Sequence, residues 1–94
     1  MMDEFSAQAA ILRNDSIDAQ VRVSVALRLG NDFPLRAREL LIEIASSPDD
    51  DARVLEAVGR ALARCSEVTS SYLTEWDCRD MTEVAYETYW AEVP

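Results

Sequence analysis

The sequence predicts an all-α fold of about six antiparallel helices in a single domain, residues 1–94. Apolar residues recur at spacings of three and four, which places them on one side of a helix. The clearest such stripe consists of Val54, Ala57, Val58, Ala61, Leu62 and Cys65. No stretch alternates apolar and polar residues for long, as a half-buried strand does. With only two glycines and three prolines, the helices are expected to be joined by short loops and to pack antiparallel.

The expected helices are residues 4–13, 18–29, 33–46, 49–64, 70–77 and 80–92. Gly30 is typical of the position just after a helix, and Asn31 or Asp32 of the cap of the next one. Pro34 then falls in a first turn, where its missing N–H costs little. The buried sides of the second and third helices are expected to be Val21, Val25, Ala26 and Leu29, and Leu40, Leu41, Ile44 and Ala45.

The last three helices have start signals of their own. Ser47 or Asp49 is expected to cap the helix that begins near residue 49. Asp80 and Glu83 have the spacing of a capping box at the start of the final helix, with Asp in place of the usual Ser or Thr. The inward stripe of that final helix is expected to be Met81, Val84, Ala85 and Thr88.

Two stretches of the chain resemble each other at an offset of 31 residues. Asp18 coincides with Asp49 and Arg22 with Arg53, and a third, fainter copy has Val84 where the arginine is expected. Identity of turn, charge and apolar stripe together favours a real repeat. A fixed period in the thirties is typical of stacked supersecondary units.

The stretches DAQVRVSVALRLG (18–30) and LLIEIASSPDDDARVLEAVGRALA (40–63) resemble HEAT repeats. Each unit of that family is a pair of antiparallel helices with an aspartate-rich turn and an arginine that opens the second helix. The resemblance implies a short right-handed α-solenoid with Asp–Arg pairs inside it. It covers residues 11–63 better than 70–92 and indicates architecture, not function. The structural positions that it implies are Asp18, Arg22, Asp49 and Arg53.

The chain is strongly acidic, and all nine of its positive charges are arginines. Its net charge is −9, and residues 65–94 alone hold seven acidic side chains and one arginine. Binding to nucleic acid or to an anionic membrane requires a basic surface, so neither partner is expected. A basic protein partner is instead attracted and steered by this charge.

Several catalytic residue sets are absent from the sequence, and no pair suited to acid–base catalysis stands out among its eighteen acidic side chains, so the protein is not expected to be an enzyme. Without histidine or lysine it has no Ser-His-Asp triad, no Schiff base and no P-loop lysine. Cys65 and Cys78 lie thirteen residues apart, unlike zinc ligands. No metal and no cofactor are therefore expected. The acidic N-terminus, the short apolar runs and the two cysteines favour a cytoplasmic location.

Asp49, Asp50 and Asp51 permit three interpretations: a metal site, a contact to a partner, or a helix start. A calcium loop alternates its ligands and needs a glycine and a distal glutamate, and this stretch has neither feature. Acidic side chains at a helix start complement its positive end, which favours the third interpretation. Asp50 and Asp51 have Ala19 and Gln20 as counterparts, so the repeat does not require them. They are the candidates in this turn for contacting a partner.

Residues 70–90 hold five of the seven aromatic side chains, interleaved with acids. Tyr and Trp provide large contact areas with a polar tip and dominate interface hot spots. The expected partner contacts here are Glu75, Trp76, Asp77, Asp80, Glu83, Tyr86, Glu87 and Trp90. The alternative is that the aromatics close the small core. That alternative is favoured for Trp76, and both stay open for Tyr86 and Trp90.

These features favour an acidic protein-binding inhibitor. The sharper hypothesis is an immunity-type protein that neutralises a basic toxin, such as a nuclease from interbacterial competition, by covering its active or substrate-binding surface. Known immunity proteins are often small and acidic, and this chain is similar to them in that general respect. The alternative is a HEAT-like adaptor that joins proteins without inhibiting any of them.

Overall fold

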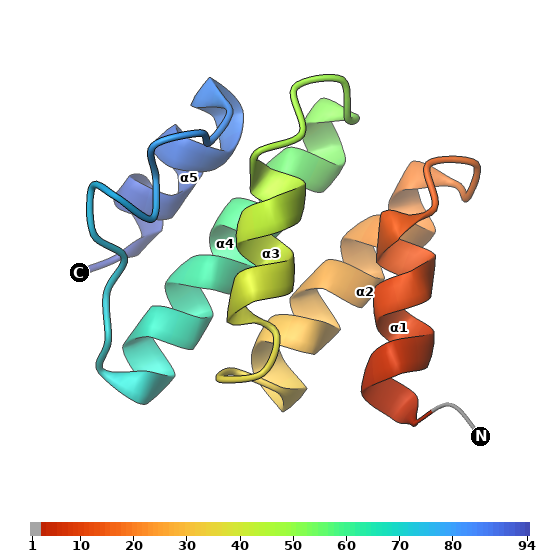
Figure 1. The fold of residues 1–94 in the computed structure, drawn as a ribbon, viewed down its shortest axis with the longest axis horizontal. Helices are drawn as coiled ribbons and strands as arrows, with labels where there is room; N and C mark the ends of the chain where they lie inside the picture. Colours follow the sequence, from red (N-terminus) through yellow and green to blue (C-terminus); the bar gives the residue numbers. More distant parts are fainter. Residues whose placement is uncertain (1–2) are drawn as a thin grey trace.

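The computed structural model describes residues 3–94, which fold into five α-helices without any β-strand (Figure 1). The helices are α1 (Glu4–Arg13), α2 (Ala19–Asp32), α3 (Arg38–Ala45), α4 (Ala52–Thr69) and α5 (Glu83–Glu92). The all-α prediction is confirmed. Five helices form in place of the six expected.

The helices lie in two layers (Figure 1). α1 and α3 form the front layer, and α2, α4 and α5 lie behind them. Residues 70–82, which we call the connecting segment, occupy the front layer beside α3 without forming a helix. α4 is central and packs against α2, α3 and α5. α1 and α5 therefore stand at opposite ends of a molecule measuring 35 × 27 × 19 Å.

The core lies along the stripe of α4, where apolar side chains of all five helices meet. Full burial of a side chain as large as valine or leucine stabilises the fold by about 1.5–3 kcal/mol relative to leaving it exposed. The largest fully buried side chains are Tyr89, Leu12, Leu29, Leu41, Leu62, Val54, Val58, Cys65 and Ser66. Burial raises the pKa of the Cys65 thiol to about 11, so this cysteine is an unreactive core residue at neutral pH.

The predicted helix over residues 70–77 does not form. After α4, Ser70 adopts a left-handed backbone conformation (φ 54°, ψ 35°) that ends the helix. Further on, the Asp77 carboxylate accepts hydrogen bonds from the N–H and hydroxyl of Thr74, at 2.9 and 3.1 Å. Such local side-chain bonds satisfy the backbone in place of helical ones.

The third helix begins at Arg38, five residues later than predicted. Phe33 donates its N–H to the Leu29 carbonyl and ends α2, and the chain then turns until Ala37 donates to the Phe33 carbonyl at 2.9 Å. Pro34 therefore lies in the turn and not in the first turn of a helix. α2 continues through Gly30 and ends at Asp32, so the prediction that Gly30 follows the end of the helix is wrong.

Two further caps differ from the prediction. Asp51, and neither Ser47 nor Asp49, caps α4 and accepts from the Arg53 N–H at 2.8 Å. Thr82, and not Asp80, caps α5. Asp18 caps α2 and accepts from the Gln20 N–H at 2.9 Å. The two caps Asp18 and Asp51 are 33 residues apart, whereas the sequence echo pairs Asp18 with Asp49 at an offset of 31.

At Gly30 the backbone of α2 closely approaches α4. A Cβ atom at this position would lie 2.8 Å from the Ala61 Cβ and 2.9 Å from the Ala61 carbonyl oxygen. Since the backbone of α4 cannot move aside cheaply, Gly30→Ala is expected to destabilise. An overpacking penalty of about 1–3 kcal/mol, less a helix-propensity gain of about 1 kcal/mol, gives a net loss of up to about 2 kcal/mol. Urea denaturation followed by circular dichroism measures it.

The matched control is Asn31→Ala, at the next and exposed position of the same helix. This change is expected to leave stability unchanged or slightly raised, because Ala is the better helix former. If Gly30→Ala is as stable as Asn31→Ala, the two helices are not in the close contact described here.

Candidate protein-binding site

Arg22 and Asp50 form an ion pair inside the molecule. Their side chains are 3% and 9% exposed, and the two terminal guanidinium nitrogens of Arg22 donate to the two Asp50 oxygens, both at 2.7 Å. Arg22 Nε and Nη2 also donate to the Leu12 carbonyl, at 3.0 and 2.7 Å. The hydrogen-bonded guanidinium lowers the pKa of Asp50, and the Asp50 carboxylate raises the pKa of Arg22. Arg22, which belongs to α2, thus links the C-terminal end of α1 to the turn before α4.

The sequence assigns Asp50 to a partner, but the structure turns its carboxylate inward, where both oxygens are used by Arg22. Arg22 itself is structural, as the HEAT resemblance implies, although its acidic partner is Asp50 and not Asp18. The sequence does contain a signal for a buried ion pair at Arg22. Arg22 lies on the buried stripe of its helix with Val25 and Leu29, and a buried arginine requires an acidic partner.

Arg53 and Asp51 lie on the surface of the α4 start. The Arg53 side chain is 68% exposed, and its Nε and Nη2 donate to the Asp51 carboxylate at 3.1 and 3.0 Å. Hydrogen bonds from Arg53 lower the pKa of Asp51. Arg53 is therefore no internal partner, contrary to the repeat-based expectation. Asp18 and Asp49 are likewise exposed.

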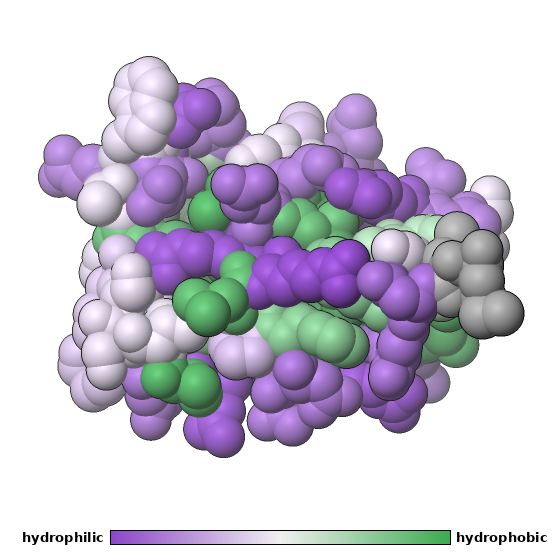
Figure 2. All heavy atoms as spheres, turned by 60° about the horizontal axis from the view of Figure 1, so that its bottom comes forward, coloured by the Kyte–Doolittle hydropathy of each residue, from purple (hydrophilic) through white to green (hydrophobic). Residues whose placement is uncertain are grey.

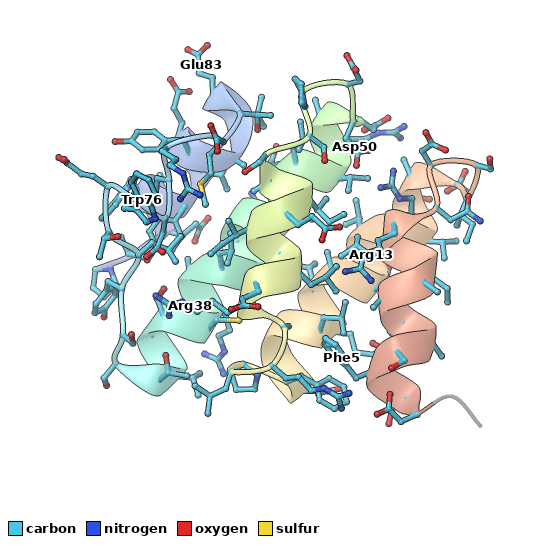
Figure 3. All side chains as sticks on the ribbon, viewed as in Figure 1. Phe5, Arg13, Arg38, Asp50, Trp76 and Glu83 are labelled. Carbon is cyan, nitrogen blue, oxygen red and sulfur yellow. The ribbon has the colours of Figure 1, made fainter. Side chains whose placement is uncertain are left out.

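A groove of about 380 Å³ lies between the α1–α2 turn and the α3–α4 turn. Figure 3 shows Arg13 reaching from α1 toward α3, where its Nε lies 3.0 Å from a Glu43 oxygen. The Ser47 hydroxyl donates to the Glu43 main-chain carbonyl at 3.2 Å. Among the described residues, no group of three or more His, Cys, Asp and Glu is placed to hold a metal ion. The groove lining is Arg13, Asp15, Arg22, Glu43, Ile44, Ser47, Asp49 and Asp50.

Aromatic and acidic side chains gather on the connecting segment and α5. We call this the C-terminal face. Figure 2 shows residues of intermediate hydropathy, drawn white, gathered at this end of the molecule. The exposed members predicted from the sequence are Glu75, Trp76, Asp80, Glu83, Tyr86, Glu87 and Trp90. Asp77 is half-buried, and its carboxylate is bonded to Thr74. Figure 3 shows Trp76 and Glu83 on the outside of this end.

Trp76 is not part of the core, because it is 71% exposed. The core interpretation favoured from the sequence is therefore wrong for this residue. Tyr86 and Trp90 are also exposed and lie edge to face, with ring centroids 6.2 Å apart. Trp90 also packs against the buried ring of Tyr89 at 4.9 Å, so it is anchored on one side and open on the other.

Tyr89 holds the connecting segment in place, a role that the sequence did not indicate. Its hydroxyl lies 2.7 Å from the Ser66 Oγ and accepts from the Leu73 N–H at 2.9 Å. The buried side of α5 is thus Ala85 and Tyr89, while Val84, expected to point inward, is exposed. The four-residue spacing from Ala85 to Tyr89 was the available signal.

Arg79 is the other residue that sequence reasoning missed. Its guanidinium carbon lies 4.0 Å from the centroid of the Trp76 ring, and its Nη1 donates to the Trp76 carbonyl at 2.6 Å. Arg79 is the one basic residue in the acidic stretch 65–94.

The chain matches no known protein-family model, no curated protein and no solved structure. In the part of the chain that the structure describes, no helix is both long and apolar enough to cross a bilayer. The fold and the site define a small all-α protein with an exposed acidic and aromatic face.

Proposed function

We propose that this protein is a small acidic inhibitor of the immunity type, which binds a basic toxin, such as a nuclease, in the bacterial cytoplasm. The observation that carries this proposal is the C-terminal face, where the exposed indole of Trp76 stands among acidic side chains. A largely exposed tryptophan stabilises the isolated fold little, but in a partner's pocket it becomes an anchor.

Inhibition works by occlusion. The carboxylates of Glu75, Glu83 and Glu87, all exposed, pair with the arginines and lysines that the toxin uses to bind phosphates. Trp76 and Tyr86 fill pockets between those charges. The net charge of −9 steers the approach, so association is fast and weakens as salt is added.

The fold proposed to carry this face is a short HEAT-like stack. α1 with α2 and α3 with α4 form the helix pairs, and the connecting segment with α5 takes the place of a third pair. Two observations support it: the two-layer order of the helices (Figure 1), and the buried positions of α2, which recur in α4 33 residues later. Arg22, Val25 and Leu29 correspond in this way to the buried Leu55, Val58 and Leu62.

A HEAT-like adaptor is the second candidate, and the same helix pairing favours it. Co-expression with the product of the adjacent reading frame separates the two functions. For an inhibitor, the neighbour alone arrests growth and co-expression restores it. An adaptor binds a neighbour that is harmless by itself. Should the neighbour be toxic and co-expression protect nothing, the immunity proposal is wrong.

Trp76→Ala is expected to weaken binding of the basic partner by about 2 kcal/mol or more, which is roughly thirtyfold or more in Kd, as for a central anchor. Helicity is expected to stay unchanged because the side chain is exposed. Isothermal titration with the purified partner measures the affinity, and circular dichroism measures the helicity.

Leu35→Ala is the matched control for this experiment, since Leu35 is also a strongly exposed large apolar residue, 75% exposed in the turn between α2 and α3. It is expected to leave the Kd unchanged. If both variants lower affinity equally, or neither does, the C-terminal face is not the binding site.

A further inference from the structure

The pairing of Arg79 with Trp76 shows which cation this face accepts. The guanidinium lies over the indole at 4.0 Å. Its ion pair with Asp80 is long, at 3.6 Å between Nε and Oδ2, and both side chains are largely exposed. The stack on Trp76 and the 2.6 Å bond to the Trp76 carbonyl are therefore the contacts that hold Arg79 in place.

An indole distinguishes arginine from lysine. The guanidinium is planar and weakly hydrated, so it stacks on the ring while its N–H groups remain free for carboxylates. An ammonium group is compact and strongly hydrated, and it gains less from the same ring. The exposed Asp80 carboxylate, which lies 3.6 Å from the Nε of the guanidinium now on Trp76, is placed to accept such an N–H group. Asp77 is already occupied by Thr74.

We infer that the Trp76 indole is the docking point for an arginine side chain of the partner, and that Arg79 occupies it in the free protein. On binding, the partner's arginine replaces Arg79 on the ring, and Arg79 moves to solvent beside Asp80. Arg79 thus acts as an internal competitor, which occupies one face of the most exposed aromatic ring described and raises the threshold for binding. This inference rests on the proposed function, because it requires the partner to be basic.

Arg79→Lys tests the competition without changing the charge of the protein. Two synthetic probes are titrated against the full chain at low ionic strength: an arginine-rich peptide, and its counterpart with lysine at every arginine. In the unmodified protein the peptide's arginine exchanges for Arg79 on the same ring, so little preference between the two peptides is expected. Arg79→Lys removes the competing guanidinium and is expected to raise affinity for the arginine peptide by about two- to fivefold, the range for an exposed cation–π contact, and to leave affinity for the lysine peptide unchanged.

The second variant combines Trp76→Ala with Arg79→Lys, and it is expected to abolish the preference for the arginine peptide that Arg79→Lys creates. The inference is overturned if Arg79→Lys binds the arginine peptide no more tightly than the unmodified protein, or if the combined variant keeps the preference. The peptide preference of Arg79→Lys and the protection from a toxin are separate readouts. Loss of protection with the preference intact refutes the inhibitor function alone, and protection without any preference refutes the arginine docking point alone.

Discussion

Replacing Arg22 by alanine is expected to lower the free energy of unfolding by about 3–5 kcal/mol, because it leaves a buried carboxylate without its partner. The Asp50 oxygens lose both guanidinium bonds, and the Leu12 carbonyl loses two more. A domain of this kind is stable by only about 5–15 kcal/mol in total. Chemical denaturation at neutral pH measures the change.

Arg13→Ala is the matched control, because the Arg13–Glu43 pair joins similar elements but is half exposed. Surface pairs of this kind contribute at most about 1 kcal/mol. If the two variants are equally stable, the Arg22–Asp50 pair is not buried in solution as it is here.

The stability that the Arg22–Asp50 pair contributes is expected to fall in acid. The pKa of Asp50 is lowered in the folded protein by its bonds to Arg22. The stability from this shift is therefore complete above the unfolded pKa of about 3.9 and is lost as the pH falls through the folded pKa. The difference in unfolding free energy between the unmodified protein and Asp50→Asn should accordingly be largest above pH 4 or so and shrink below it.

Tyr89→Ala is the second change with a large expected effect, a loss of about 3–5 kcal/mol. Tyr89 is fully buried, and its hydroxyl bonds the Ser66 hydroxyl of α4 and the Leu73 N–H of the connecting segment. Truncation therefore removes a core ring and frees the segment. Tyr89→Phe keeps the ring but leaves two buried polar groups unsatisfied, with an expected loss of about 1–3 kcal/mol.

Tyr86→Phe serves as the control, since its hydroxyl belongs to an exposed side chain on the same helix. Thermal unfolding is expected to place the order of stability as Tyr86→Phe, then Tyr89→Phe, then Tyr89→Ala. A Tyr89→Phe variant as stable as Tyr86→Phe would show that the hydroxyl of Tyr89 does not hold the segment.

Periodicity predicted the helices well where tertiary contacts agree with it. The bounds 4–13 of α1 are those expected, and the stripe of α4 from Val54 to Cys65 is buried. It failed at residues 70–77, where the Thr74 and Asp77 side chains compete for the backbone. The sequence comparison also failed in the turn before α4. It set the repeat offset by matching identical residues, and not by matching buried positions.

The exposure and partners of the candidate-site residues could be predicted less well from the sequence than the helices could. The composition of residues 70–90 indicated an acidic and aromatic surface, but no spacing rule tells whether a tryptophan outside a helix points outward. Trp76 is in such a position. The role of Asp50 depends on Arg22, 28 residues away, and only the fold brings these two residues together. A buried arginine could be expected from the stripe of α2, but its partner could not.

The connecting segment gives the molecule two levels of rigidity. Its main-chain and side-chain bonds to the helices are Ser71 N–H to the Ser66 carbonyl, Leu73 N–H to Tyr89, Arg38 to the Ser71 carbonyl, and Thr82 N–H to the Ala45 carbonyl. Opening this part melts no helix but exposes the buried Leu73 and Cys78 side chains, so its free energy is expected to lie between zero and that of global unfolding. A partner can therefore remould the surface around Trp76 while α1 to α4 keep their shape. Adaptability at the contact is thereby separated from the stability of the scaffold.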